Sequence, residues 1–412
     1  MTRSIFGHLT CALLLCAASA TLAAKDAAWT SAWTAAPDSA GPALHAQTVR
    51  QIVRVGIGGS SLRIRLSNAY GTGPVTIGSV HVAVHAQASA IHEGSDRAVT
   101  FAGQPTLILA KGADGLSDPV ALPVSALEEL AVSLYVPGRV ATSTLHGTGM
   151  QTAYLTESGD AAAATVFASS ETSSSRFFLT EVQVTSGAPV GALVVMGDSI
   201  ADGVGSTPDR NARWPDVLAE RLHAAHAQDD RALVSIAVVN AGIAGNRLLR
   251  GEDAPYIGVS GLSRLDHDAL DKPGVRWLLL DEGINDISAG SVLPTPADDV
   301  SAERIIDGMR RVIARAHAKG IKVWGATLLP FAGAEWPFHS TAGEAKRAVV
   351  NAWIRHGGAF DAVIDFERVA RDPAHPNRIR PEYDSGDHIH LNDAGYRALA
   401  ASIDLGLFAR AR

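Results

Sequence analysis

The stretch LVVMGDSIADGVGS, Leu193 to Ser206, joins an apolar run to a glycine-rich loop. A short, unbroken apolar run is typical of a strand that is buried on both faces of a parallel sheet. The run ends at Gly197-Asp198-Ser199, so it brings a serine hydroxyl to the end of a buried strand. The G-x-S-x-G pattern that marks the nucleophile of many serine hydrolases is absent here. The role of this serine must therefore be sought in the segments that follow.

Downstream of residue 187, apolar runs alternate with segments of helical periodicity. This alternation predicts an α/β domain with a parallel, doubly wound sheet. In the segment 301–320 the apolar side chains recur on one helical face, and Gly320 stands where a helix would end. We expect strands over 191–197, 233–242, 275–283, 321–330 and 361–366, and helices over 214–227, 301–320, 341–357 and 391–403.

Upstream of this domain, residues 28–185 have the pattern of a β-rich region. In SLRIRLSNAYGTG, which begins at Ser61, apolar and basic residues alternate and then meet a turn. Many short runs of this kind predict an all-β sandwich of the jelly-roll type. The Ser-rich segment 168–176 is expected to be an exposed loop. We place the β domain at 25–186 and the α/β domain at 187–412.

Each strand of the predicted α/β sheet is followed by a polar or glycine-rich segment. Ligands bind at the carboxyl ends of strands in such sheets, so these segments should meet at one edge. They contain Ser199, Gly245, Asn285 and the pair Asp387 and His390.

Together these residues could perform acyl transfer. Ser199 can supply a nucleophilic hydroxyl, His390 can accept its proton, and Asp387 can fix the tautomer of the imidazole. The backbone N–H groups of Ser199 and Gly245 and the side-chain amide of Asn285 could hold a developing oxyanion.

Each of these residues also has a purely structural interpretation. Ser199 could cap a helix, Gly245 could serve a turn, and Asn285 could cap a loop. His388, beside His390, could instead form a metal site with the neighbouring aspartates. The spacing of His390 from Asp387 suits a triad better than the spacing of His388 does, and no further cluster of metal ligands accompanies the pair. We therefore predict no metal and no cofactor.

Four short blocks follow one another along the α/β region: GDS at 197–199, NAGIAGN at 240–246, GIND at 283–286 and DHIH at 387–390. They resemble the blocks of the SGNH hydrolases, also called the GDSL esterase and lipase family, and they occur in the expected order. The resemblance implies a flavodoxin-like three-layer sandwich and a serine esterase. It implies Ser199 as nucleophile, His390 as base, Asp387 as its partner, and Ser199, Gly245 and Asn285 as the oxyanion hole.

The segment 48–84 resembles the leading β domain of a secreted, two-domain subgroup of these hydrolases that is grouped with carbohydrate esterases. This resemblance implies acyl esters, especially acetyl, on a plant polysaccharide such as xylan. Further candidates for substrate contact are Arg247, Trp336, Phe338 and His388, although Arg247 could instead pair with a carboxylate and the two aromatic residues could pack within their loop.

Three other functions compete with this one. The first is a lipase or arylesterase acting on lipid or small aryl esters. The second is a polysaccharide-binding protein whose α/β domain is inert, and the third is a metal-dependent hydrolase. The intact set of serine, glycine, asparagine and histidine residues argues against the second.

Composition and targeting limit the partners. The formal charge of −7 without a basic cluster argues against nucleic acid and anionic membranes. Residues 1–24 have the pattern of a cleavable signal peptide, with Arg3 before a short apolar core, which predicts a secreted or periplasmic protein without stable membrane insertion. Both cysteines, Cys11 and Cys16, lie in that segment, so the mature chain would have no disulfide. The sequence leaves the oligomeric state open.

Overall fold

The fold is described from a computed structural model of the 412-residue chain. The structure describes residues 28–186, 190–227, 235–251, 256–293, 295–334 and 337–408. The predicted signal peptide lies outside these residues, and the predicted domain boundary adjoins residues 187–189, which are also outside them. Within the described residues, no helix has both the length and the apolar character needed to cross a bilayer.

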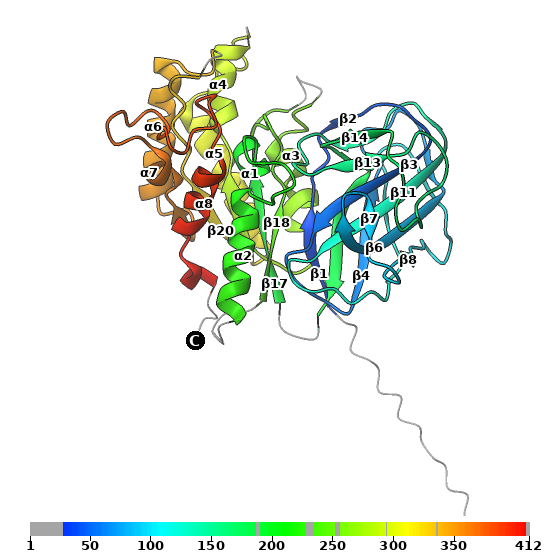
Figure 1. Cartoon of the computed structure of the whole chain (residues 1–412). Helices are drawn as coiled ribbons and strands as arrows, with labels where there is room; N and C mark the ends of the chain where they lie inside the picture. Colours follow the sequence, from blue (N-terminus) through cyan, green and yellow to red (C-terminus); the bar gives the residue numbers. More distant parts are fainter. Residues whose placement is uncertain are drawn as a thin grey trace, which may run out of the picture.

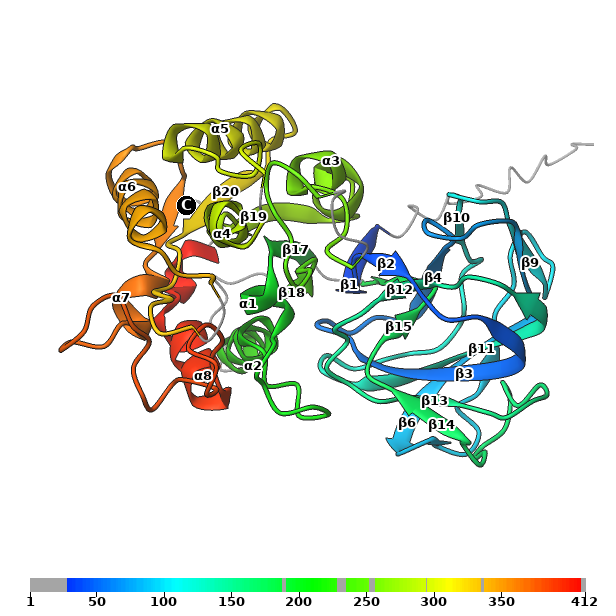
Figure 2. The same cartoon turned by 90° about the horizontal axis from the view of Figure 1, so that it is seen from above.

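The C-terminal region is built on one parallel sheet, which confirms the predicted α/β domain. Its strands run in the order β18-β17-β19-β20-β21, so the first strand of this region in sequence lies inside the sheet (Figure 2). The strands are β17 Val190–Gly197, β18 Ser235–Asn240, β19 Val275–Asp281, β20 Lys322–Ala326 and β21 Ala362–Ile364.

Helices cover both faces of this sheet (Figure 2). In β17 Leu193 and Val195 belong to one hydrophobic core, while Val194 and Met196 belong to the other. Because successive strand residues point to opposite faces, an apolar run without alternation is needed to fill both cores. The helices are α1 Ser199–Asp202, α2 Trp214–Ala227, α3 Gly261–Leu265, α4 Ile284–Val292, α5 Ala302–Ala318, α6 Thr341–His356, α7 Phe366–Ala370 and α8 Asp393–Ser402, with single turns η1 Asp266–Leu270 and η2 Leu405–Phe408.

The predicted helix 301–320 shows why these elements form where they do. Ser301 caps α5 by accepting a hydrogen bond from the Arg304 N–H. The apolar face of α5 packs on the sheet, and Gly320 follows its end with a φ of +71°, a conformation that favours glycine.

The N-terminal region is all-β, as predicted. Its sheets have the strand orders β14-β13-β3-β11-β6-β7, β1-β16-β4-β10, β15-β12-β2 and β5-β9, and β8 pairs with β6. The strands are β1 Trp29–Thr34, β2 Ser39–Ala40, β3 Leu44–Arg54, β4 Ser61–Ser67, β5 Val75–Ile77, β6 Ser79–Gln87, β7 Ala90–Ile91, β8 Arg97–Ala98, β9 Leu107–Leu109, β10 Asp114–Leu116, β11 Glu129–Val140, β12 Thr144–His146, β13 Ala153–Leu155, β14 Glu171–Ser173, β15 Arg176–Phe177 and β16 Leu179–Thr185.

The prediction of an exposed loop over 168–176 is wrong in part. Strand β14 lies inside this segment and pairs with β13. Arg176, the last residue of the segment, is buried and begins β15. Its guanidinium donates hydrogen bonds to the carbonyl oxygens of Gly149 and Gln151, which lie far from it in the sequence. A polar composition alone could not reveal these partners.

The two regions pack against each other side by side (Figure 1). Strand β1 lies next to β18 and β17, and the Thr34 hydroxyl donates a hydrogen bond to the Asn240 carbonyl oxygen at 2.7 Å. One hydrophobic core contains Val132 of the β region as well as Val194 and Ile305 of the α/β region. The β region therefore shares a core with the sheet that carries the candidate site.

Candidate active site

The carboxyl ends of the parallel strands place the predicted site residues together. Ser199 begins α1 directly after β17, and Asn285 is the second residue of α4, after β19. Gly245 follows β18, whereas His390 lies in the segment before α8. All four line the same cavity. Asp198, rather than Ser199, caps α1, because its carboxylate accepts the Ile200 N–H at 3.0 Å.

Ser199, His390 and Asp387 form a chain of hydrogen bonds. His390 Nε2 lies 2.8 Å from Ser199 Oγ, and His390 Nδ1 lies 2.6 Å from Asp387 Oδ2. The other carboxylate oxygen of Asp387 accepts the backbone N–H groups of Ile389 and His390 at 2.9 and 2.8 Å. The carboxylate is thereby oriented by its own turn. This arrangement provides a nucleophile, a base and an orienting group for the base.

The protonation of this chain follows from its hydrogen bonds. Partial burial opposes ionisation of Asp387, but the bonds from the His390 side chain and backbone hold the pKa of Asp387 well below its usual range. An ionised Asp387 requires the proton of the neutral imidazole to lie on Nδ1. Nε2 is then free to accept the proton of the Ser199 hydroxyl.

Gly245 lies in a tight turn that aims backbone at the cavity. The Asn246 N–H donates to the Ile243 carbonyl at 3.0 Å, which closes the turn, and Gly245 has a φ of +78°. A Cβ at this position would lie 2.7 Å from Ile257 Cγ2, so both conformation and space favour glycine. In the described part of the chain, the Gly245 N–H makes no hydrogen bond.

Asn285 presents a side-chain amide to the same cavity. Its Nδ2 donates one hydrogen bond to the Asn246 carbonyl at 2.9 Å, which leaves the second N–H for a ligand. The neighbouring Asp286 accepts the backbone N–H groups of Leu248 and Leu249 at 2.7 and 3.0 Å. The segment after β18 is thus tied to the segment after β19 by both side chains.

Arg264 holds three strand-end segments together, and the sequence analysis missed it. Its guanidinium donates to Asn246 Oδ1 at 2.9 Å, to the carbonyl oxygens of Ala241 and Gly197 at 2.5 and 3.1 Å, and to Glu282 at 3.1 Å. It is buried on the short helix α3. Its partners come from distant segments, so no local pattern could have indicated this role.

Four buried carboxyl groups stand at the strand ends near the nucleophile: Asp198 precedes Ser199, Asp281 ends β19, and Glu282 and Asp286 follow it. Burial raises the pKa of Asp198 to about 7, although the hydrogen bond from Ile200 and the charge of His390 oppose the rise. Burial also raises the pKa of Asp286 to about 6 and the pKa values of Asp281 and Glu282 well above their usual range.

The cavity beside Ser199 has a volume of about 460 Å³. Its polar groups gather around the serine, and its remaining walls are apolar. Phe338, a predicted substrate contact, lines it. The apolar side chains in its walls are Ile200, Val204, Ala244, Ile284, Leu328, Leu329, Pro330, Phe331, Phe338 and Ile389.

The other predicted substrate contacts have different positions. Arg247 is buried, pairs with Asp298 at 2.9 Å and is absent from the cavity walls, so its alternative interpretation as an ion-pair partner fits the structure. His388 is also absent from the walls; its Nδ1 lies 2.5 Å from Asp384, and half of its side chain is exposed. Trp336 lies outside the described residues.

The two neighbouring histidines do not share a ligand site. His388 contacts Asp384, whereas His390 contacts Asp387 and Ser199. In the described residues no group of three histidine, cysteine or acidic side chains is arranged to hold a metal ion.

One protein family matches the α/β region of this chain. The model of the GDSL-like lipase/acylhydrolase family matches residues 195–398. No curated protein matches the chain.

The chain is also similar to solved structures over about half its length. A carbohydrate acetylesterase family member from Sinorhizobium meliloti is 16% identical, with 52% of this chain and 94% of that chain covered and a TM-score of 0.40. An aryl esterase from M. smegmatis is 18% identical, with 52% and 95% covered and a TM-score of 0.38. A GDSL-like lipase from Bacteroides thetaiotaomicron is 17% identical, with 52% and 88% covered and a TM-score of 0.38.

The family match spans the strand ends that carry Ser199, Gly245, Asn285 and His390. Through residues 195–398 this chain belongs to the GDSL-like lipase/acylhydrolase family, and it is a carboxylic ester hydrolase.

Proposed function

We propose that the chain hydrolyses esters through an acyl-enzyme on Ser199. The observation that supports this most directly is the unbroken contact chain Ser199–His390–Asp387 at the edge of an apolar cavity. Ser199 Oγ attacks the ester carbonyl carbon while its proton passes to His390 Nε2. The carbonyl oxygen becomes an oxyanion, which accepts hydrogen bonds from the Ser199 and Gly245 N–H groups and from Asn285.

The reaction is completed by collapse of the tetrahedral intermediate. The bond between the carbonyl carbon and the alkoxy oxygen breaks, and His390 returns its proton to the departing alcohol. A water molecule then attacks the acyl-enzyme with His390 as base. The acid leaves and Ser199 regains its proton.

For the substrate, we propose an acetyl ester of a polysaccharide such as xylan. This proposal rests on the resemblance of the segment 48–84 to the β domain of secreted carbohydrate esterases. It goes together with export of the chain by a signal peptide at residues 1–24. Acetate released from acetylated xylan by the purified chain is the outcome it requires.

A second candidate substrate is an ester with a larger apolar acyl or aryl group. The cavity favours such a substrate, because its volume of about 460 Å³ is larger than one methyl group fills and its walls are mainly apolar. Burying each further CH₂ contributes about 0.8 kcal/mol, or roughly fourfold in kcat/KM.

The reaction is tested with the Ser199→Ala variant on p-nitrophenyl acetate. Loss of at least about 10⁴-fold in kcat, with an unchanged melting temperature, is expected. Turnover at the wild-type rate in this variant would exclude the acyl-enzyme.

The substrate is tested with p-nitrophenyl esters from acetate to hexanoate, beside acetylated xylan. A rise in kcat/KM along the series without acetate release from xylan would favour the apolar ester. Phe338→Ala should then lower kcat/KM for hexanoate more than for acetate. Preference for acetate together with acetate release would favour the polysaccharide.

A further inference from the structure

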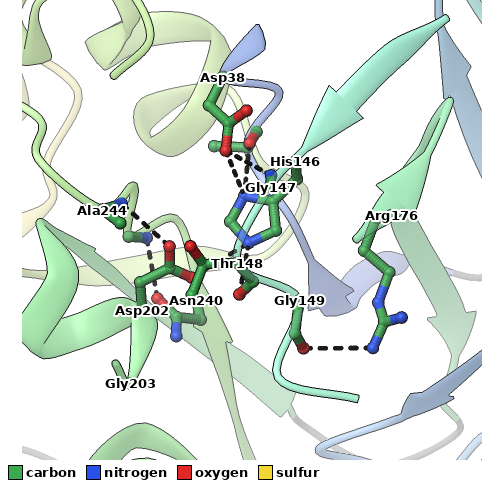
Figure 3. Close-up of polar contacts among 12 residues, drawn as sticks. Asp38, His146, Gly147, Thr148, Gly149, Arg176, Asp202, Gly203, Asn240 and Ala244 are labelled. Atoms are coloured by element: carbon green, nitrogen blue, oxygen red, sulfur yellow. Dashed lines mark hydrogen bonds and ion pairs between the residues drawn. The ribbon is translucent and has the colours of Figure 1, made fainter. Parts of the chain in front are cut away.

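A buried histidine of the β region reaches the backbone N–H of Ala244, the residue before Gly245, through one carboxylate (Figure 3). His146 ends β12, and only 5% of it is exposed. Its Nε2 lies 3.0 Å from Asp202 Oδ1, and its Nδ1 lies 3.5 Å from Asp38 Oδ2. Asp38 belongs to the β region, whereas Asp202 belongs to α1 of the α/β region.

Among the described residues, both ring nitrogens of His146 face acceptors and no donor. Nδ1 lies 2.9 Å from the Ala36 carbonyl oxygen, and Nε2 lies 3.2 Å from the Thr148 carbonyl oxygen in addition to Asp202. A neutral imidazole has a proton on one nitrogen only, so these contacts require the imidazolium. Burial alone would lower the pKa of His146, but the carboxylates of Asp202 and Asp38 raise it to about 9.

Asp202 passes the contact on to the oxyanion segment. Its Oδ2 accepts the backbone N–H of Ala244 at 3.0 Å, and Ala244 immediately precedes Gly245. Asp202 also lies three residues after Ser199, in the same helix. One carboxylate therefore links the segment of the nucleophile to the turn that carries a proposed oxyanion donor.

Two other charged side chains lie near His146, and each has hydrogen-bond partners of its own. Arg176 is the strand neighbour of His146, and with Arg213 and Asp202 it lines the small space beside the imidazole. The Arg176 guanidinium donates to backbone carbonyls, and Arg213 pairs with Asp216 at 2.6 Å. Asp202 and Arg213 also interact through their charges, but neither arginine donates a hydrogen bond to Asp202 in the described structure. His146 is the cation in direct contact with this carboxylate.

We propose that His146 and Asp202 are positioning residues for ester hydrolysis, through which the β region fixes the direction of the Gly245 N–H. This inference rests on the proposed function. The imidazolium of His146 orients the carboxylate of Asp202, and this carboxylate accepts the Ala244 N–H. Because Gly245 follows Ala244 directly, the turn that contains Gly245 is fixed as well. If the Gly245 N–H points away from the oxyanion, the transition state is stabilised less, whereas binding of the substrate in its ground state is unchanged.

The test compares two histidines at the same interface. His267 also joins the regions: its Nε2 lies 2.7 Å from Asp114 of β10, and its Nδ1 lies 2.6 Å from Asp268. Neither residue lines the active-site cavity. His267→Gln is therefore the matched control for His146→Gln, although His267 is more exposed.

We expect His146→Gln to lower kcat on p-nitrophenyl acetate by about 10- to 100-fold, since losing an oxyanion donor outright costs about 10²–10³-fold. KM should change less than about threefold. Affinity for a trifluoromethyl ketone, whose adduct with Ser199 carries an oxyanion, should fall in step with kcat. His267→Gln should leave all three quantities unchanged.

Asp202→Asn gives a second, isosteric variant with the same expected loss, in case His146→Gln does not fold. The wild type offers a further measurement that needs no variant at His146. Its kcat should fall above about pH 9, where His146 loses its charge, and His267→Gln should retain this fall.

The inference is overturned if a folded His146→Gln or Asp202→Asn variant keeps the wild-type kcat. It is also overturned if His267→Gln lowers kcat as much as His146→Gln does. If neither His146→Gln nor Asp202→Asn folds, a wild-type kcat that stays constant up to pH 10 overturns it. Activity that persists in Ser199→Ala would instead refute the proposed function itself, so the two failures are distinguishable.

Discussion

The two regions of this molecule differ in what they give to the site. In the described structure the α/β region supplies every residue that lines the cavity, because its parallel strands deliver their following loops to one edge. The β region supplies none of these residues, yet its His146 reaches Asp202 beside the nucleophile. A region without any group at the site therefore still contacts the helix of the nucleophile through one buried ion pair.

The interface itself repeats this contrast. His146 and His267 each lie between a carboxylate of the β region and one of the α/β region. Only Asp202, the partner of His146, also holds the backbone next to Gly245. Similar chemistry at the same interface therefore has different consequences, depending on what the second carboxylate holds.

The largest effect should come from the base. His390→Gln removes the acceptor of the Ser199 proton, and we expect kcat to fall by about 10⁴-fold or more. The matched control is His388→Gln, two residues away, where kcat on p-nitrophenyl acetate should change less than about threefold because His388 does not line the cavity. Equal losses in both variants would argue against His390 as the base.

Next comes the oxyanion donor on α4. Asn285→Ala removes a side-chain amide from the cavity, and kcat should fall by about 10²–10³-fold with a small change in KM. Ser288→Ala, on the same helix, removes a buried hydroxyl whose hydrogen bonds in the described structure go to the Ile284 and Asn285 carbonyls, and it should leave kcat unchanged. A rise in KM without a fall in kcat for Asn285→Ala would assign Asn285 to substrate binding.

A smaller effect is expected in stability against pH. Folding raises the pKa of His146 from about 6.5 to about 9, so its charged form stabilises the folded state. This contribution to the unfolding free energy is fully present below pH 6.5 and is lost as the pH rises to about 9. The unfolding free energy of the wild type should therefore fall by about 3 kcal/mol more than that of His146→Gln over this range. Urea unfolding at both pH limits measures this difference, and parallel pH dependences would contradict it.

The smallest effect should come from the rim of the interface. Arg54 of β3 pairs with Glu220 of α2 at 2.7 Å, but the Glu220 side chain is 47% exposed. Exposed ion pairs contribute less than about 1 kcal/mol, so Glu220→Gln should lower the unfolding free energy by about 0.5 kcal/mol and leave kcat unchanged. If Glu220→Gln lowers the unfolding free energy as much as His146→Gln does, then location at the interface, and not burial, determines how much an ion pair stabilises the protein.

Much of the fold follows from local patterns. The unbroken apolar run before Ser199 and the periodic face of 301–320 predict a buried strand and a helix correctly, because burial imposes periods of its own on each element. The alternation of apolar and basic residues around Ile64 correctly predicts strand β4. Polarity predicts less well in the segment 168–176, since the carbonyls that accept from Arg176 are supplied by the fold.

The class of each region, the order of the strand-end segments and the residue types at their edge follow from the amino-acid sequence. The partners of the buried charges do not: packing of distant segments turns Arg247 toward Asp298, places Arg264 among three strand-end segments and brings His146 to Asp202. Periodicity reports whether a side chain is buried. The partner of a buried charge depends on which distant segments pack against it, and spacing along the chain carries no record of that.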